Sequence, residues 1–450
     1  MSSASAAVAL LAGGGLVAAL TQLPLAWDGA YIAMNVLWTQ APFAPHERWA
    51  NIPLQVPTLL LSRWITGSDV LTIVFSASYA LIPAVALAVS WWVVRRQRPH
   101  LILWPALGIG LVALPGQAFF VSEAIFSTQL MWPLVLAAAV GDLRRHGLLL
   151  GGLALFLAVA HPITIPLLGL VLVFGLLPRR GRPTRPAAIA SVLGAVVLLL
   201  FGLRFLGGAN GYQTDQISLG VLADQAEAVL TPRPLIALIL TTLGAWLLLL
   251  RKAALGVLGT VMDGVAVGSL LGAGAVLLHW AADPFAWTSA LEYRGLVLFT
   301  MLPLYGGALI DARWRADNLS ERRLPRVRRA ALVLASGVWA GVTVLQGLSW
   351  HATLNDFRMY LELSPRACVP SDTIGGIERS PLHHWSVTPL SLLVGGREPP
   401  RLVLQGDGCQ QRLANGFPIT GVEVRGWEAR WFEMAPLQRL IAVEQGEPRP

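Results

Sequence analysis

Residues 70–94 read VLTIVFSASYALIPAVALAVSWWVV and are followed at once by Arg95 and Arg96. The stretch contains no charged side chain, and an α-helix of this length crosses the roughly 30 Å of hydrocarbon in a bilayer. The whole chain of 450 residues is 55% hydrophobic and 13% charged. Soluble domains carry about 25% charged residues. The sequence therefore predicts an all-α polytopic membrane protein.

Apolar runs of this kind recur along the first 350 residues. We expect about 11 transmembrane helices, at residues 5–26, 70–94, 101–120, 124–141, 147–160, 163–178, 187–206, 234–250, 257–280, 295–311 and 331–350. The runs 147–160 and 163–178 are short and are divided by His161-Pro162, so they can instead form one broken element. The first run lacks a basic start and a clear cleavage site, which predicts a retained helix rather than a signal peptide.

Arginines alternate between the loops and predict an orientation. One set of loops holds the clusters Arg95, Arg96, Arg98, then Arg144, Arg145, then Arg179, Arg180, Arg182, Arg185, then Arg251, Lys252, and finally Arg313, Arg315, Arg322, Arg323, Arg326, Arg328, Arg329. The other set has only scattered arginines. Basic loops face the cytoplasm, so we expect a bacterial inner-membrane protein with a cytoplasmic N-terminus and a periplasmic C-terminus. Because the net charge of +8 comes from these short loops, it does not indicate nucleic-acid binding.

Three longer segments face the outside in this topology: 27–69, 207–233 and 351–450. The first is rich in aromatic residues, with Tyr31, Trp38, Trp49 and Trp64 among them. Tryptophan and tyrosine favour the membrane interface, and apolar faces hold short helices flat there. We therefore expect two amphipathic helices in this loop, joined through Pro42 and Pro45.

Asp28 stands where the chain leaves the first helix, within Trp27-Asp28-Gly29-Ala30-Tyr31. A boundary acid without a function is one interpretation. A helix, an outer aspartate and two amphipathic helices also resemble the opening of the GT-C superfamily of membrane glycosyltransferases, which use polyprenyl-phosphate or related lipid-linked sugars. The resemblance implies that Asp28 is the catalytic base or positions the acceptor, with Tyr31 beside it in substrate binding.

The motif departs from the paired acids of many GT-C enzymes, because Gly29 and Ala30 follow Asp28. A lone carboxylate is a poor site for a divalent cation. We therefore expect no resident metal from this motif, although a divalent cation stays possible as a cofactor.

Further polar residues on the outer side are candidates for the same site. Glu123 lies between the third and fourth runs, and Glu47 stands in His46-Glu47-Arg48. Either acid can orient the acceptor, and the alternatives are a boundary residue and a surface ion pair. Cationic or hydrogen-bonding side chains that can bind a lipid phosphate are His46, Arg48, His161, Arg204 and Arg294. Asp263 lies within a run and is a functional candidate by its depth, but we do not place it in the outer site.

The tail 351–450 is polar enough for a small α+β domain that rests on the outer loops. Strand character occurs at 401–404, 419–424 and 431–432, and helical character at 354–363 and 437–443. Cys368 and Cys409 are the only cysteines, and in an oxidising compartment they can form a disulfide or remain two thiols. His383-His384-Trp385 can contact an acceptor sugar, although structural packing is the alternative.

The hypothesis that follows is a glycosyltransferase that moves a sugar from a polyprenyl-phosphate-linked donor to an extracytoplasmic glycan, lipid or protein. Asp28 would act as the base. Two other classes stay open: a lipid or solute transporter, and a membrane scaffold without catalysis. Motifs for ATP binding, zinc proteolysis and serine hydrolysis are absent from the sequence.

Overall fold

The computed structural model describes most of the chain in nine long segments. These are residues 2–44, 49–65, 67–112, 121–140, 143–158, 232–250, 256–282, 297–314 and 326–364, with shorter pieces elsewhere. The expected span 187–206 and the segment 207–233, except for its last two residues, lie outside the described residues. The expected span 163–178 lies almost entirely outside them.

Five helical stretches are long and apolar enough to cross a membrane. They are α1 (Ser3–Leu20), the joined pair α4 (Ser68–Ala80) and α5 (Ile82–Val94), α7 (Glu123–Val140), most of α14 (Gly256–Ala281) and α17 (Arg326–Leu363). The run that opened the sequence thus forms two helices end to end, because Pro83 lacks the N–H that would continue the helix. These helices indicate a membrane protein.

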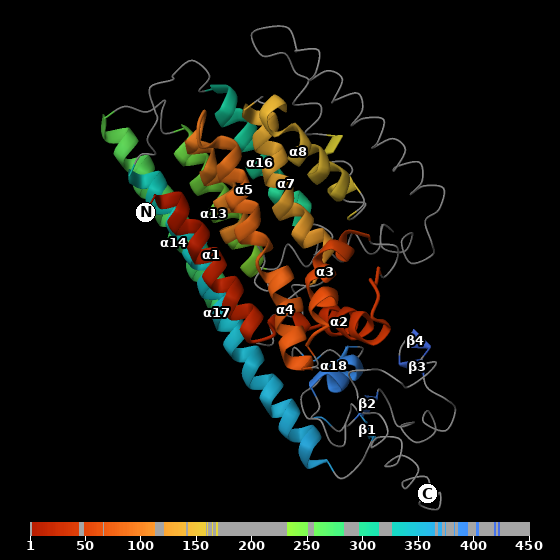
Figure 1. Ribbon diagram of the computed structural model, residues 1–450. Helices are drawn as coiled ribbons and strands as arrows, with labels where there is room; N and C mark the ends of the chain where they lie inside the picture. The colour runs from red at the N-terminus through yellow and green to blue at the C-terminus, as the bar shows by residue number, and fades with distance from the viewer. Residues whose placement is uncertain are drawn as a thin grey trace, which may run out of the picture.

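Other expected spans contain further described helices. They are η4 (Pro99–Ile102), α6 (Leu103–Leu107) and η5 (Gly108–Val112), then α8 (Leu143–Ala158), α13 (Pro232–Leu250) and α16 (Val297–Trp314). Figure 1 shows them packed beside the five long stretches, so that the bundle is built from roughly antiparallel helices. Within it, α1 packs on α17, α5 on α7, α7 on α16 and α13 on α14.

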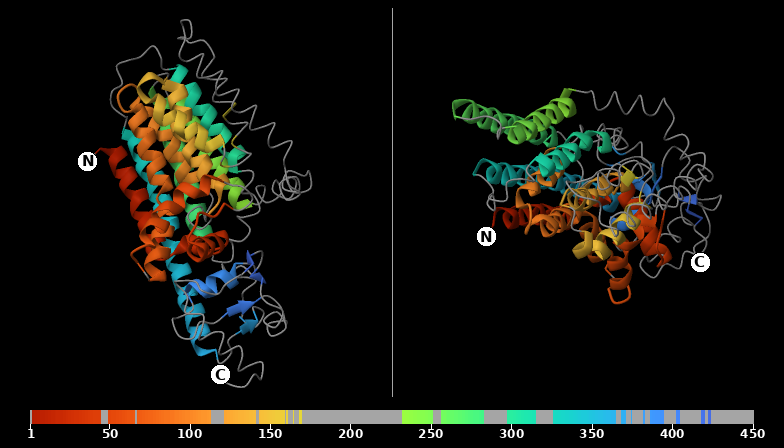
Figure 2. Two further views of the ribbon diagram at one scale, coloured as in Figure 1. Left: turned by 45° about the vertical axis from the view of Figure 1, so that its right-hand side comes forward. Right: turned by 90° about the horizontal axis from the view of Figure 1, so that it is seen from above.

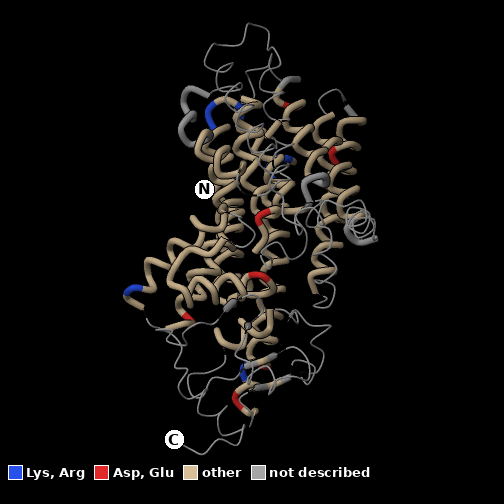
Figure 3. Tube along the Cα trace, turned by 90° about the vertical axis from the view of Figure 1, so that its right-hand side faces the viewer, with Lys and Arg blue, Asp and Glu red and all other residues tan. Residues whose placement is uncertain are grey.

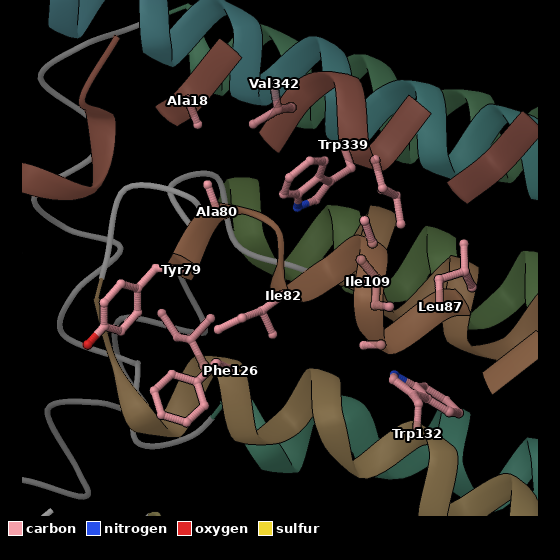
Figure 4. Packing of buried hydrophobic residues seen from close by; sticks show 14 of the residues in the cluster. Ala18, Tyr79, Ala80, Ile82, Leu87, Ile109, Phe126, Trp132, Trp339 and Val342 are labelled. Carbon is pink, nitrogen blue, oxygen red and sulfur yellow. The ribbon is translucent and has the colours of Figure 1, made fainter. Parts of the chain in front are cut away.

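Large aromatic side chains fill the centre of the bundle. Trp132 lies against Tyr305 with ring centroids 4.5 Å apart, and the Tyr305 hydroxyl donates to the Thr128 carbonyl oxygen at 2.6 Å. Figure 4 shows Trp132 and Trp339 reaching into the buried cluster from opposite helices. A Cβ on Gly108 would stand 2.5 Å from the Trp132 ring, so a glycine is needed there.

The last long helix differs from the expectation of a span at 331–350 and a separate helix at 354–363. α17 is one helix of 38 residues. No glycine or proline interrupts residues 348–363, so nothing ends the helix at the edge of the apolar run. Figure 2 shows its C-terminal part projecting beyond the bundle beside the C-terminal elements.

The first outer loop contains the two expected helices, α2 (Asp28–Thr39) and α3 (Ile52–Leu61), with η3 (Trp49–Asn51) before α3. α3 exposes Val56 and Leu60 on one face, as an interfacial helix would. α2 instead buries all of its residues from Ile32 to Leu37. Other elements therefore cover α2, so that this helix, unlike α3, does not present an exposed apolar face.

One of those elements comes from the tail. α18 (Val387–Val394) is buried along its whole length and contacts α2 and α4. It connects the parallel strands β1 (Cys368–Pro370) and β2 (Leu402–Leu404), and the Ser391 hydroxyl accepts a hydrogen bond from the Val403 N–H at 3.1 Å. β3 (Pro418–Ile419) and β4 (Val422–Glu423) form a second, antiparallel pair. The expected elements at 431–432 and 437–443 lie outside the described residues.

We call the end of the bundle where α2, α3 and α18 lie the α2 end (lower part of Figure 1). Figure 3 shows how sparse charged residues are along the described helices. Away from the α2 end, the buried Asp311 accepts a hydrogen bond from the Trp104 indole at 3.0 Å and lies 3.6 Å from the guanidinium of Arg328. Arg328, which we expected in a basic cytoplasmic loop, is buried and also donates to the Leu248 carbonyl oxygen at 2.6 Å.

The loop arginine Arg98 also contacts α16 near Asp311. Its guanidinium donates to the carbonyl oxygen of Ala312. Burial lowers the pKa of Arg98, and the negative charge of Asp311 acts in the opposite direction. Asp311, Arg328 and Arg98 together therefore join residues of α13, α16 and α17 to the loop before α6.

Candidate functional site

A tight turn carries the chain from α1 into α2 and ends at Asp28. It contains η1 (Leu23–Leu25) between two residues with positive φ: Gln22 (φ 56°, ψ 28°) and Trp27 (φ 55°, ψ −129°). Large side chains rarely adopt such angles. The turn therefore holds its shape against local preference, and contacts elsewhere must stabilise it.

Gly29 explains why no second acid follows Asp28. A Cβ at this position would overlap the carbonyl oxygen of Pro24 and would stand 3.1 Å from Cγ2 of Val121. A second acid directly after Asp28 therefore cannot be accommodated in this turn. The glycine also lets the start of α2 lie against the segment that leads into α7.

Asp28 is half-buried at the first residue of α2. Its carboxylate benefits from the partial positive charge of the helix N-terminus. Burial, together with the negative charge of Asp28, raises the pKa of Tyr31 one turn later. Tyr31 is therefore protonated at neutral pH and can donate a hydrogen bond, and its ring packs edge-on against Phe43 at 5.3 Å.

Glu123 begins α7 and is almost fully buried, with 2% of its surface exposed. The amide of Asn51 donates a hydrogen bond to its Oε1. The hydroxyl of Tyr79 in turn donates to Oδ1 of Asn51 at 3.3 Å. Figure 4 shows the Tyr79 hydroxyl pointing away from the apolar side chains around it. α7, η3 and α4 thus meet in one buried polar group, which we call the Glu123 cluster (Glu123, Asn51 and Tyr79).

The connection between α2 and α3 is held by a second set of hydrogen bonds. The Gln55 side chain accepts from the Phe43 N–H at 2.8 Å and donates to the Phe43 carbonyl oxygen at 2.6 Å. The Ser62 hydroxyl donates to Oε1 of Gln40 at 3.0 Å. The first residues after α2, Gln40 and Phe43, are therefore tied to α3 and to Ser62 at its C-terminal end.

The structure brings Asp28, Tyr31 and Glu123 to the α2 end. The close approach of Gly29 and Val121 makes the segments of Asp28 and Glu123 neighbours. The remaining candidates Glu47, His46, Arg48, His161, Arg204 and Arg294 lie outside the described residues. So do Cys409 and the side chain of Cys368, and the expected disulfide with them.

Asp263 lies on α14, which packs chiefly on α13. Within the described part of the chain, no group of three His, Cys, Asp or Glu side chains converges in a way that could hold a metal ion.

Sequence reasoning missed Asn51, Gln55 and Tyr79. A signal was present for the first two, because Asn51, Gln55, Thr58 and Ser62 recur at helical spacing in an otherwise apolar stretch. All four are buried. The stripe predicts a polar face turned inward rather than to water, which is the reverse of an ordinary amphipathic helix.

Comparisons with protein-family models, curated proteins and solved structures found no match to this chain. The function is therefore argued from the residues and their geometry.

Proposed function

We propose that the chain is a glycosyltransferase of the GT-C type, which transfers a sugar from a polyprenyl-phosphate-linked donor to an extracytoplasmic acceptor. One observation carries the proposal: a half-buried carboxylate, Asp28, at the N-terminus of a buried helix whose start lies against the segment leading to Glu123. In the proposed topology this end faces the outer surface of the membrane, where a lipid-linked donor and an aqueous acceptor would both reach it.

In this reaction Asp28 takes the proton of the acceptor hydroxyl as its oxygen attacks the anomeric carbon of the sugar. The bond between that carbon and the phosphate oxygen breaks, and the polyprenyl phosphate leaves with the electron pair. Tyr31, one turn after Asp28, donates a hydrogen bond to the bound substrate. The Glu123 cluster orients the acceptor, because a buried carboxylate keeps a fixed direction when a neighbouring amide donates to it.

The leaving phosphate needs positive charge near it. We assign that role to one or more of Arg48, His161, Arg204 and Arg294, with His46 in the loop of Arg48 as a further contact. Glu47 of that loop would orient the acceptor. No resident metal is required by this mechanism.

The same proposal includes the finer architecture. The chain would cross a bacterial inner membrane 11 times with its N-terminus in the cytoplasm. Residues 1–350 would form the GT-C-like membrane domain. Residues 351–450 would form a small periplasmic α+β domain with a disulfide bond between Cys368 and Cys409.

The test is transfer by the purified protein with a panel of polyprenyl-phosphate sugars. We expect Asp28→Asn to lower the rate by at least about 100-fold, the lower range for losing a general base. Glu123→Gln should reduce the rate less, because the amide can still occupy the site. Asp356→Asn is the matched control, since this acid is exposed on α17.

A folded Asp28→Asn variant with wild-type transfer would overturn the assignment of the base. Failure of the wild-type protein with every donor, together with movement of a labelled lipid across proteoliposomes, would favour the transporter. Failure in both assays would favour the scaffold.

A further inference from the structure

Gln22 lies at the junction of three elements and is 5% exposed. Its side-chain amide donates to Oγ1 of Thr72 at 2.8 Å and to the Asp69 carbonyl oxygen at 3.4 Å, both on α4. Its Oε1 accepts from the guanidinium of Arg358 at 3.0 Å. Its carbonyl oxygen accepts from the Trp350 indole at 3.0 Å. Every polar atom of the side chain is thus used.

Two of these partners come from α17. Trp350 and Arg358 are two turns apart, and Arg358 lies in the part of α17 that continues past the expected end of the last span. Through Arg358, this extension of α17 therefore contacts Gln22 just after the C-terminal end of α1, more than 300 residues away in the sequence.

Backbone hydrogen bonds continue from Gln22 to Asp28. The Leu25 N–H donates to the Gln22 carbonyl oxygen at 2.9 Å, Ala26 N–H to Leu23 at 3.1 Å, and Gly29 N–H to Ala26 at 3.2 Å. These hydrogen bonds couple the backbone from Gln22 to Gly29, so a shift of Gln22 would also move Asp28, the first residue of α2.

We propose, on the premise of the proposed function, that Gln22 and Arg358 are positioning residues for Asp28. They hold the α1–α2 turn in the conformation in which Gln22 is left-handed. α17, which carries Arg358, thereby fixes the position of the Asp28 carboxylate. Neither residue touches substrate. Their hydrogen bonds stabilise the positive φ angles that Gln22 and Trp27 would rarely adopt by themselves.

Arg358 also lies 3.4 Å from the carboxylate of Asp69, but this pair contributes little. Asp69 has 72% of its side chain exposed and Arg358 has 26%. An ion pair this open to water is screened. The bond from Arg358 to the buried Gln22 is the one on which the turn depends, so Asp69→Asn separates the two contacts.

The kinetic test uses Arg358→Gln and Gln22→Gly in the full-length protein. Glycine suits the left-handed backbone of residue 22, so the second variant removes the side-chain contacts without opposing the turn. We expect kcat to fall about tenfold to 100-fold, as for a misplaced catalytic group, with KM nearly unchanged. Arg358→Lys should recover part of the loss. Arg63→Gln, at an exposed arginine after α3, should behave as wild type.

A second measurement does not depend on transfer. Hydrogen exchange of a peptide covering residues 22–29 should become faster in Gln22→Gly and Arg358→Gln, and should stay near wild type in Asp69→Asn and Arg63→Gln. Unchanged exchange in the first two variants would overturn the proposal, as would full kcat in an active enzyme. If the two variants exchange faster but the wild-type protein transfers no sugar, the contacts of Gln22 and Arg358 with the turn are supported and the proposed function is contradicted.

Discussion

At Glu123 the chain buries a carboxyl group at the start of an apolar helix, where it needs a hydrogen-bond donor. Asn51 supplies that donor from 72 residues away, and Tyr79 orients Asn51. The sequence predicted Glu123 as a candidate because a lone acid between two apolar runs is conspicuous. It did not predict Asn51 or Tyr79, since pairing across helices depends on how they pack.

Asn51→Leu removes the donor and leaves the Glu123 carboxyl buried beside an apolar side chain. We expect this variant to lose about 1–3 kcal/mol of unfolding free energy, the cost of a buried polar group without its partner. The double variant Asn51→Leu/Glu123→Met should recover most of the loss, because both partners are then apolar. Tyr79→Phe, the control, should cost less, since its bond is longer.

Thermal or denaturant unfolding in detergent measures all three variants. A double variant no more stable than Asn51→Leu alone would show that Glu123 is stabilised chiefly by other groups, and the Glu123 cluster would lose its energetic basis.

Helices in this bundle approach one another over glycine. A Cβ on Gly15 of α1 would stand 2.6 Å from the Ala80 carbonyl oxygen, and one on Gly14 would stand 3.0 Å from Cα of Ala340. The first contact joins α1 to α4, and the second joins it to α17. Glycines in an apolar run are visible in the sequence, but only the packing decides which of them face a neighbour.

Gly13 and Gly15 form a matched pair within α1. Nothing lies within 4 Å of a Cβ on Gly13, which is exposed. Gly13→Ala should therefore leave the unfolding free energy unchanged or raise it by up to about 1 kcal/mol through helix propensity. Gly15→Ala should cost about 1–3 kcal/mol, because the backbone of residue 80 must move. Melting temperatures in detergent test the difference, and equal effects would contradict the packing of α1 on α4.

At the scale of the whole molecule, the C-terminal elements join the first outer loop. α18 is buried against α2 and α4, and Arg358 on α17 reaches Gln22. The turn that carries Asp28 is consequently enclosed by residues from both ends of the chain. A tail resting on the outer loops was expected, but a helix seated directly on α2 was not.

The arginine clusters predict the orientation of this assembly. An alkaline phosphatase fused after residue 450 should be active, because the enzyme folds only outside the cytoplasm, while fusions after residue 97 should be inactive. Basic loops are retained in the cytoplasm during insertion. Fluorescent-protein fusions, which report the opposite side, provide the control. The reverse pattern would invert the topology and place Asp28 in the cytoplasm.

Composition and the spacing of apolar runs determined the class of this protein by themselves, because a charge-poor chain with helices of bilayer length has no soluble surface. Asp28, Tyr31 and Glu123 were also visible, since isolated polar residues at the ends of apolar runs need a reason. Tertiary structure alone decided the rest: α17 as one helix, the burial of α2, and the contacts of Asn51, Tyr79, Gln22 and Arg358. Each of these depends on groups far apart in the chain that satisfy one another only after the helices pack.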